Sequence, residues 1–458
     1  MTPGARYQAV LEILSEVCDR TSGFPRPLEA VCADFFRKRR YIGSKDRSAI
    51  ASFVYGIARS WAQILFYGAS QGRDLSHFWK GRAPEGSARF ALLTYLAGVQ
   101  KIPLRDIELL WSGDLYHPES LTASEKRWLK GPFPADTSLP RWVQAGVSDA
   151  WFACFERQFG EEAFAVLTGL LESAPTDLRV NLLKTNRLQM MERLKLRGIE
   201  NAQTPYSPWG IRLTARHALT GLPEFAEGLF EIQDEGSQVM ASLLAARQGD
   251  RVLDLCAGAG GKTLALGMMM ENRGQIWATD VAKWRLERTR VRAKRAGLFN
   301  VQYRALEGLE DSWLVKHEGY FDRVLLDVPC SGTGTWRRHP EQKWHCDPSF
   351  LEPLLKQQQD ILTLGARMVR KGGRLLYGTC SLLELENQAQ VHLFLEAHPD
   401  FKIRPHGAPR TEGPSYIADL QSQGLPDKPL PLTPEGFLVM RPDQTGTDGF
   451  FAACLEKI

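Results

Sequence analysis

The chain has 458 residues, of which 43% are hydrophobic and 24% are charged, so its composition predicts a large soluble globular protein rather than a disordered or fibrous one. That length is typical of two or three domains. No run of about 18 apolar residues occurs, and the first residues lack the basic, apolar and small-residue pattern of a secretory signal. We therefore expect neither a membrane span nor export, and a cytoplasmic location.

The cysteines are spread along the chain without any C-x-x-C pair. Zinc sites and disulfide frameworks both need closely or regularly spaced cysteines, so this distribution argues against either one, and we expect no metal. A cysteine with a special role is then better interpreted as a reactive thiol.

The chain is mildly basic overall, with a formal net charge of +4 and a sequence pI near 8.5. These totals are compatible with a polyanionic partner and do not require one. The distribution of charge is more informative, because the segment from Arg37 to Arg47 carries six basic side chains against a single acid, Asp46, with Tyr41 among them. We predict that this segment binds phosphates; the alternative is a solvated helix end.

Apolar residues at spacings of three and four predict a helical bundle in the first third of the chain, with helices over residues 5–20, 26–40, 46–68 and 86–99. Proline and turn-forming residues over 114–140 predict a linker after the bundle. Between Leu178 and Phe230, short apolar runs flank a helix near 187–198, which predicts a small α+β unit.

Beyond Gly236, helices alternate with short apolar strands, in the order RVLDL, QIWAT, VQYRA, DRVLLD and GRLLYGT. That alternation predicts a doubly wound, Rossmann-like parallel sheet of the α/β class. Ligands of such sheets bind outside the carboxyl ends of the strands, so each loop directly after a strand is a candidate site. The predicted domains are a helical bundle over 1–140, a helical linker with the α+β unit over 141–235, and the sheet domain over 236–458.

The loop after the first of these strands reads DLCAGAGGKT, from Asp254 to Thr263. Its glycines allow the backbone to approach a ligand closely at a helix start, where unpaired N–H groups favour a carboxylate or phosphate. The loop fits neither the dinucleotide fingerprint nor the phosphate-binding G-x-x-x-x-G-K-[ST] pattern, which would need glycine at Thr263 and at Cys256 respectively. The next strand ends in Asp280, at about the spacing expected for an acid that accepts hydrogen bonds from ribose hydroxyls. Together these features predict a nucleoside-bearing cofactor; the alternative is a merely structural tight turn.

Two further strands end next to cysteines. The fourth strand leads into DVPCSGTGT, which contains Cys330, and the fifth ends in YGTCS, which contains Cys380. A single cysteine is most often a small buried hydrophobe. Two cysteines at strand ends, each flanked by small polar residues and expected at the same edge of the sheet as the glycine loop, favour a functional pair.

These motifs together resemble the RsmB/NOP/Sun family of RNA (cytosine-5) methyltransferases over nearly the whole chain. The matching segments are LDLCAGAGGKT, Asp280 with Arg285, LLDVPCSGTGT followed by RRHPEQKW, YGTCSLLELEN, FEIQDEGSQ and TDGFFAACLEK. The helical first third resembles the NusB-like RNA-binding domain of the bacterial RsmB-type members, and the RRHP segment favours their ribosomal RNA branch. The resemblance implies S-adenosylmethionine as methyl donor and RNA, most specifically 16S ribosomal RNA, as substrate of a monomeric protein.

The resemblance also implies roles for four side chains. Cys380 would be the nucleophile that adds to carbon 6 of cytosine, because carbon 5 is otherwise a poor nucleophile. Cys330 would assist the release step after methyl transfer. Asp327 would hold the ring nitrogen or the exocyclic amine of the base, and Lys262 would contact the cytosine and assist proton handling; the alternative for Lys262 is a solvated lysine at a helix start.

The implied donor site has Asp280 on the ribose hydroxyls, Arg285 supporting that acid, Asp327 nearby, and the backbone of the glycine loop: Cys256, Ala257, Gly258, Ala259, Gly260, Gly261 and Lys262. Two departures from the family pattern occur. Many members place an aspartate after the third strand to bind the adenine amine, whereas here the stretch is RALEGLED and Glu307 is the best-placed acid. The common CAAPGGK loop is CAGAGGK here, which gives the turn more freedom at Gly258.

Two other classes share part of this pattern. A dinucleotide-dependent oxidoreductase would use the sheet and Asp280 but would not need paired cysteines at strand ends. A non-catalytic RNA-binding assembly factor would need only the basic regions, so the presence of all four implied catalytic residues argues against it. Within the favoured class, transfer RNA is an alternative substrate, because it requires the same catalytic core.

Overall fold

The computed structural model describes residues 1–18, 27–404 and 428–458, and these divide into two compact units. The helical unit comprises Met1–Ser173 together with Trp336–Phe350, and the sheet unit comprises Ala174–Thr335 together with Leu351–Ile458. The chain therefore passes from the sheet unit into the helical unit and back again. The chain changes unit after Ser173, Thr335 and Phe350, whereas the domain limits predicted from the sequence lie at residues 140 and 235.

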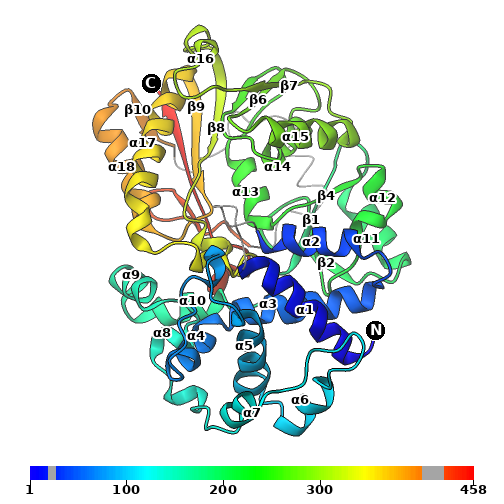
Figure 1. Cartoon of the computed structure of the whole chain (residues 1–458). Coiled ribbons are helices and arrows are strands. Elements are labelled where there is room, and N and C mark those ends of the chain that lie inside the picture. Colours follow the sequence, from blue (N-terminus) through cyan, green and yellow to red (C-terminus); the bar gives the residue numbers. More distant parts are fainter. Residues whose placement is uncertain (19–26, 405–427) are drawn as a thin grey trace. The chain divides into compact units, whose positions relative to one another are not determined.

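Along its described residues the helical unit forms ten α-helices (Figure 1). They are α1 (Pro3–Cys18), α2 (Leu28–Lys38), α3 (Ser44–Arg59), α4 (Trp61–Ala69), α5 (Ser87–Thr94), α6 (Leu104–Leu110), α7 (Ala123–Leu129), α8 (Arg141–Gln144), α9 (Asp149–Phe159) and α10 (Ala163–Gly169). The residues at three-to-four spacing form its core, as expected: Val10 and Leu14 of α1 and Ile57 of α3 are fully buried. The last two residues of the first predicted helix and the first of the second lie outside the described residues.

Two segments of the helical unit differ in detail from the sequence prediction. The helix predicted over 46–68 is two helices, because the backbone turns at Ser60 (φ −89°, ψ 14°). Among the described helices none is by itself long and apolar enough to cross a bilayer; α3 and α4 pass that test only as a pair, bent by 61°. The predicted linker contains α7, whose start is marked by a capping box between Thr122 and Glu125 that the prediction overlooked.

The segment Trp336–Phe350, which contains RRHPEQKW, belongs to the helical unit. The ring of Trp336 packs on that of Trp151 with centroids 5.2 Å apart, and Trp344 joins the apolar core of the bundle. The Glu341 carboxylate accepts a hydrogen bond from the Leu28 amide at 3.1 Å, at the start of α2. These contacts make the segment part of the hydrophobic core, which spacing along the sequence cannot reveal.

The sheet unit begins with a four-stranded antiparallel sheet in the order β2-β3-β1-β4. Its elements are β1 (Thr176–Val180), α11 (Arg187–Leu196), β2 (Asn201–Gln203), β3 (Gly210–Leu213), α12 (Pro223–Ala226) and β4 (Phe230–Ile232). Their apolar side chains form a separate small core, with Leu178, Met190 and Ile211 fully buried. The small α+β unit predicted between residues 178 and 230 is therefore present.

The larger sheet has the strand order β10-β12-β9-β8-β5-β6-β7, with β11 paired to β12. Its strands are β5 (Arg251–Asp254), β6 (Gln275–Asp280), β7 (Val301–Ala305), β8 (Phe321–Asp327), β9 (Val369–Thr379), β10 (Phe401–Ile403), β11 (Leu438–Met440) and β12 (Phe450–Lys457). The five predicted strands, β5 to β9, are mutually parallel, whereas β12 runs antiparallel to β9. The Rossmann-like prediction is confirmed, and the antiparallel edge is an addition to it.

Helices cover both faces of this sheet, namely α13 (Glu235–Leu243), α14 (Gly261–Met269), α15 (Lys283–Ala296), α16 (Ser312–Lys316), α17 (Leu351–Met368), α18 (Gln388–Ala397) and the short α20 (Pro442–Thr445) (Figure 1). Because successive strand residues point to opposite faces, Val252 packs in the core with α13 and α14, whereas Leu253 packs in the core with α17 and α18. The loops after β5, β6, β8 and β9 consequently emerge at one edge of the sheet.

Candidate active site

The glycine loop lies between β5 and α14 and is held in place by α15. Gly260 adopts a left-handed conformation (φ +82°), and a Cβ atom there would lie 2.4 Å from a methyl carbon of Thr289, so only glycine fits. The Thr289 hydroxyl donates to the Gly258 carbonyl at 3.0 Å, and the Arg292 guanidinium donates to the Ala259 carbonyl at 2.6 Å. The loop thus leads directly into the start of α14, where an anionic or polar ligand group is favoured.

Asp280 ends β6 beside this loop and is 6% exposed. Its two carboxylate oxygens accept hydrogen bonds from the amides of Gly258, at 3.0 Å, and Ala282, at 2.7 Å. Arg285 of α15 lies 4.0 Å from the same carboxylate and is half exposed. The predicted proximity of the three positions is therefore present, and the amide bonds fix the direction in which the carboxylate can accept further hydrogen bonds.

Glu307 follows β7 at the same edge, with an exposed side chain that forms no hydrogen bond among the described residues. Its backbone amide donates to Asp311, which also binds Arg304 and caps α16. Asp311 is thus committed to structure, and Glu307 remains the acid nearest to the end of β7 that is open to a ligand.

Asp254, at the end of β5, is completely buried below the glycine loop. One of its oxygens accepts a hydrogen bond from the Thr263 hydroxyl at 2.6 Å, while the other has no partner among the described residues. Burial, together with the nearby Asp327 carboxylate, raises the pKa of Asp254 to about 7. A buried oxygen without a partner beside the start of a helix is a feature that a bound polar ligand would satisfy.

Lys262 and Asp327 form an ion pair across the site, with Nζ 2.7 Å from the carboxylate. Lys262 is the second residue of α14 and is 8% exposed, whereas Asp327 is the last residue of β8 and about a third of its side chain is exposed. The alternative of a solvated lysine is therefore wrong. The pair places a cation and a partly exposed carboxylate between the glycine loop and the loops that carry the cysteines.

The two predicted thiols are neighbours. The Cys330 and Cys380 sulfur atoms lie 3.3 Å apart, although the residues are 50 positions apart in the chain. The hydrogen bond with Cys380, together with burial, raises the pKa of Cys330 well above its ordinary value. The raised pKa favours the neutral thiol form of Cys330.

Glu386 joins the loops that carry the two cysteines, and sequence reasoning gave it no role. It is completely buried at the end of a short 3-10 turn (Glu384–Glu386). One oxygen accepts from the Ser331 amide at 2.7 Å and from the Gln358 side chain at 3.0 Å; the other accepts from the Ser331 and Ser381 hydroxyls. Ser331 follows Cys330 and Ser381 follows Cys380, so one carboxylate fixes both neighbours. The signal was present in the motif YGTCSLLELEN, whose second glutamate is Glu386.

A close backbone contact braces the same loops from the other side. Gly334 donates its amide to the Cys380 carbonyl at 3.0 Å and accepts from the Gly449 amide at 2.8 Å. A Cβ on Gly334 would lie 2.3 Å from the Gly449 carbonyl oxygen, so neither SGTGT nor TDGFF tolerates a side chain there. The C-terminal motif thus supports the cysteine loops.

The basic segment between Arg37 and Arg47 lies in the helical unit and is only partly free. Arg39 pairs with Glu12 at 2.8 Å and Arg37 with Asp34, while Arg47 donates to the Ile42 carbonyl. The remaining three basic side chains are exposed and form no ion pair among the described residues: Lys38, Arg40 and Lys45.

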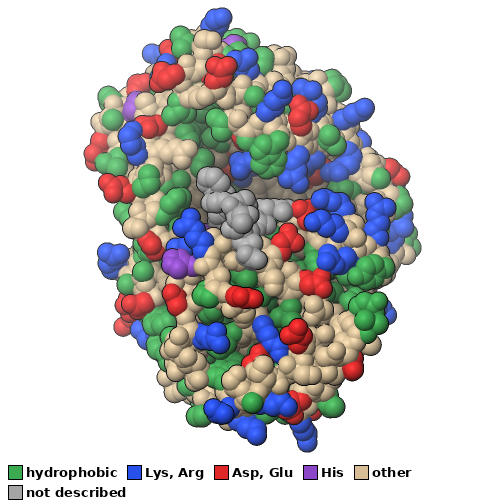
Figure 2. Space-filling model, in the orientation of Figure 1, with side chains coloured by type: hydrophobic (Ala, Val, Ile, Leu, Met, Phe, Trp, Pro, Cys, Tyr) green, Lys and Arg blue, Asp and Glu red, His purple; other side chains and the backbone are tan. Residues whose placement is uncertain are grey.

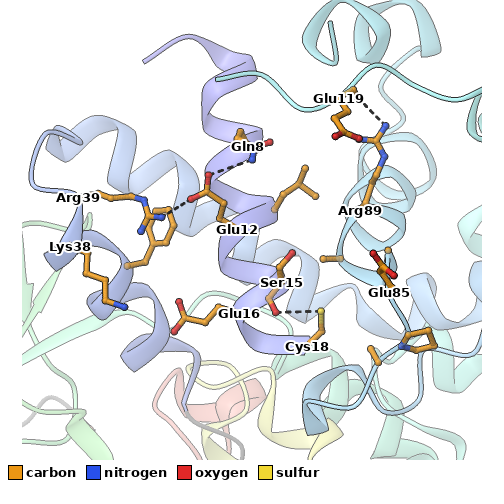
Figure 3. Close-up of a pocket in the computed structure, with 16 residues that line it drawn as sticks. Gln8, Glu12, Ser15, Glu16, Cys18, Lys38, Arg39, Glu85, Arg89 and Glu119 are labelled. Atoms are coloured by element: carbon orange, nitrogen blue, oxygen red, sulfur yellow. Dashed lines mark hydrogen bonds and ion pairs between the residues drawn. The ribbon is translucent and has the colours of Figure 1, made fainter. Parts of the chain in front are cut away.

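A groove of about 990 Å³ in the helical unit lies between α1, α2 and the start of α5 (Figure 3). Its walls carry acids as well as bases, and two of the three bases are engaged, in the pairs of Arg39 with Glu12 and of Arg89 with Glu125. None of the predicted catalytic or cofactor-binding residues lines it. A polyanion would meet mixed charge there, so the groove is not a candidate active site.

A parallel sheet with a glycine-rich loop and an acidic strand end at one edge defines the Rossmann-like class of enzymes that bind nucleoside cofactors. Comparison with known proteins narrows this class. The family model described as 16S rRNA methyltransferase RsmB/F matches residues 241–456, and that of the RsmF/B-like ferredoxin-like domain matches residues 148–220.

A Synechocystis protein named "Probable ribosomal RNA small subunit methyltransferase B" is 34% identical over 323 residues, which cover 70% of this chain and 67% of that protein. A Bacillus subtilis protein of the same name is 31% identical, with the same two coverages. The crystal structure of a methyltransferase homolog protein from Pyrococcus horikoshii superposes with a TM-score of 0.58 at 28% identity, over 71% of this chain and 100% of that one. The chain belongs to the RsmB/F family of ribosomal RNA small subunit methyltransferases, and the resemblance drawn from its motifs is confirmed.

Proposed function

We propose that this protein transfers the methyl group of S-adenosylmethionine to carbon 5 of a cytosine in 16S ribosomal RNA. The observation that carries the proposal is the pair of thiols 3.3 Å apart beside the Lys262–Asp327 ion pair, at the ligand-binding edge of a Rossmann-like sheet. Family membership gives methyl transfer to ribosomal RNA. The two thiols supply the reason to choose carbon 5 of cytosine as the acceptor.

The donor site fits S-adenosylmethionine in its polar groups. Asp280 is oriented by two amide bonds and would accept hydrogen bonds from the ribose hydroxyls, with Arg285 close to the same carboxylate. The backbone from Cys256 to Lys262 would receive the polar end of the molecule, together with the unpartnered oxygen of Asp254. Within that stretch the amides of Ala257, Gly258 and Gly260 are already hydrogen-bonded in the protein. Glu307 would meet the adenine amine. When bound, the cofactor supplies an electrophilic methyl group.

Cys380 would act on the acceptor base. Its thiolate adds to carbon 6 of cytosine and forms a carbon–sulfur bond. The electrons of the 5,6 double bond shift through carbons 5 and 4 to nitrogen 3, which takes up a proton. Asp327, with about a third of its side chain open, can hold that protonated nitrogen. Carbon 5 of this adduct has enough electron density to attack the methyl group. Carbon 5 of an unmodified cytosine does not.

Release requires two bond changes after transfer. The hydrogen on carbon 5 leaves as a proton, and its electron pair restores the 5,6 double bond while the sulfur of Cys380 departs. Cys330 is placed to assist the first change, because its sulfur lies 3.3 Å from that of Cys380. Once its own proton has passed to solvent, the Cys330 thiolate would accept the proton from carbon 5, so that Cys330 ends as a thiol and Cys380 leaves as a thiolate. Lys262, buried against Asp327, keeps that carboxylate oriented while the base is bound.

The helical unit is proposed to help hold the RNA. Its contribution would come from the exposed residues Lys38, Arg40 and Lys45, which have no acidic partner among the described residues. Reversal of these three charges should weaken RNA binding and reduce its dependence on salt, while the affinity for S-adenosylmethionine stays unchanged. Point variants suit this test better than removal of the first 140 residues, because truncation would expose Trp344, which packs in the core of the bundle.

The direct test is to incubate the purified protein with methyl-labelled S-adenosylmethionine and, separately, with 16S ribosomal RNA, assembled small subunits and transfer RNA. Digestion to nucleosides should yield labelled 5-methylcytidine from one of the ribosomal substrates. Label on another nucleoside, or on none, would refute the proposed chemistry. Labelled 5-methylcytidine from transfer RNA alone would keep the chemistry and overturn the substrate.

A further inference from the structure

Helix α15 carries far more positive charge than any function assigned so far requires. Its fourteen residues include one acid, Glu287, and seven basic residues: Lys283, Arg285, Arg288, Arg290, Arg292, Lys294 and Arg295. Figure 2 shows Lys and Arg side chains gathered over this helix on the sheet unit. Because like charges repel on one helix, such a concentration is unfavourable for an isolated helix and calls for partners.

The inner side of α15 accounts for only part of this charge. Leu286, Thr289 and Ala293 are buried toward the sheet. Arg292 and Arg295 turn back to the buried carboxylate of Glu231, at 3.0 and 2.5 Å. These two arginines are therefore structural, and through Arg292 and Thr289 the same side of the helix also supports the glycine loop.

The outer face of α15, defined here as Lys283, Trp284, Arg288, Val291 and Lys294, is different. All five side chains are exposed, and the three basic ones form no ion pair among the described residues. Trp284 is 60% exposed and Val291, two helical turns further along, is 69% exposed. An exposed tryptophan flanked by unpaired lysine and arginine is typical of a surface that binds single-stranded nucleic acid, where bases stack and phosphates pair.

The position of this face adds a second argument. Lys283 begins α15 only three residues after Asp280, so the outer face starts at the ligand-binding edge and runs away from it along the helix. At the far end Lys184 donates to the Arg295 carbonyl at 2.7 Å and to the Glu227 carbonyl, which extends the positive charge beyond α15. A strand whose target base enters the site would meet the start of this face, on which Glu287 is the single exposed acid.

We propose that the outer face of α15 is an RNA-binding surface of the sheet unit, which pairs with backbone phosphates and stacks one unpaired base on Trp284. The inference deepens the proposed function, on which it rests for RNA as the substrate. The sequence predicted RNA binding for the helical bundle and for the small α+β unit within residues 141–235, and this inference adds the outer face of α15 as a further surface.

The test is a Lys283→Glu, Arg288→Glu, Lys294→Glu variant of the full chain, with binding to a 16S ribosomal RNA fragment measured over a range of salt concentrations. Loss of three phosphate contacts should lower the logarithmic salt slope by about 2 to 3 and weaken binding at about 0.1 M salt at least tenfold. Trp284→Ala should weaken binding roughly tenfold with little change of slope, because stacking is not ionic.

The matched control is Lys316→Glu, Lys371→Glu, Lys402→Glu, which makes the same charge change with exposed lysines outside α15. Calorimetry with S-adenosylmethionine checks that the donor site of each variant is intact. Equal affinity and equal slope for the α15 and control variants would overturn the inference and leave the surface to another partner, such as a protein. Because binding is measured without turnover, RNA binding lost only in the α15 variant would stand even if no 5-methylcytidine were formed by the wild type.

Discussion

On the β5 and β6 side of the site the polar contacts are made mainly by backbone amides, whereas on the β8 and β9 side they are made by side chains. Asp280 is oriented by the amides of Gly258 and Ala282, while Cys330 and Cys380 are held through the carboxylate of Glu386. Amide contacts depend on the course of the main chain and survive many substitutions. Side-chain contacts depend on single residues. We therefore expect substitutions on the β5 and β6 side to lower the affinity for S-adenosylmethionine by degrees. Substitutions on the β8 and β9 side should interrupt the reaction.

The largest effect is expected at Cys380. Cys380→Ala should reduce methyl transfer to background, because no other thiolate is placed to attack carbon 6. Affinity for S-adenosylmethionine, measured by calorimetry, should stay within about twofold, since the thiol contacts RNA rather than the donor. Methyl transfer retained by this variant would refute its role as nucleophile.

Cys330→Ala should stop the reaction at a later point. The adduct between Cys380 and the base should still form, but its release should fail, so a protein–RNA band that survives denaturant should accumulate. The double variant that also lacks Cys380 is the control and should give no band. A band that appears with Cys380→Ala instead would reverse the two roles.

Glu386→Gln should lower turnover by roughly 10- to 100-fold, because small displacements of reacting groups are costly. The substitution keeps size but removes the charge that four donors share. The matched control is Glu384→Gln, the same change at an exposed position of the same short turn. Single-turnover rates and KM for RNA should be measured together; a fall in stability with an unchanged rate for the folded fraction would limit Glu386 to a structural role.

Asp280→Ala should weaken S-adenosylmethionine binding on the order of tenfold, since a charged hydrogen-bonded contact contributes about 1.5 to 3 kcal/mol. Maximal turnover at saturating donor should change much less, in contrast to the cysteine side. Asp280→Asn, which keeps one acceptor oxygen, should be intermediate. Calorimetry that shows unchanged affinity for both variants would place the donor elsewhere.

The smallest effect on turnover is expected from the buried acid below the glycine loop. The pKa of Asp254 in the folded protein is raised to about 7 from an ordinary value of 3.8, so the folded state holds a proton that the unfolded state has released between these values. The contribution of Asp254 to the free energy of unfolding should therefore be greatest at low pH and fall as pH rises toward 7. Asp254→Asn removes this titration, and urea midpoints should show a larger relative gain at pH 8 than at pH 5. An equal gain at both values would contradict the raised pKa.

The sequence predicted the proximity of the glycine loop and Asp280, because its determinants are local. Strand, glycine loop and helix follow one another between Arg251 and Met269, and Asp280 comes at the end of the next strand. Parallel strands bring their carboxyl ends to one edge, so the proximity of the loop and Asp280 follows from order along the chain alone. The same logic predicted that Cys330 and Cys380 share that edge.

Other features could not be obtained in this way. Glu386 and the Gly334–Gly449 contact depend on which loops meet in space, and nothing in their spacing reveals it. The segment Trp336–Phe350 continues from a motif of the sheet unit and yet packs in the core of the helical unit. The charge of α15 was visible in the sequence, but which of its basic residues are engaged by Glu231 was not.

The sequence by itself determined the order of strands and helices, the residue types at the strand ends and, through its motifs, the family. These are local properties, set by hydrophobic periodicity and by residues adjacent in the chain. Only the tertiary structure decided that the two sulfur atoms lie 3.3 Å apart, that one buried carboxylate fixes both of their loops, and that three of the six basic residues between Arg37 and Arg47 are engaged within the protein. The physical reason is that hydrogen bonds and ion pairs act over a few ångströms in space, whatever the separation of the residues along the chain.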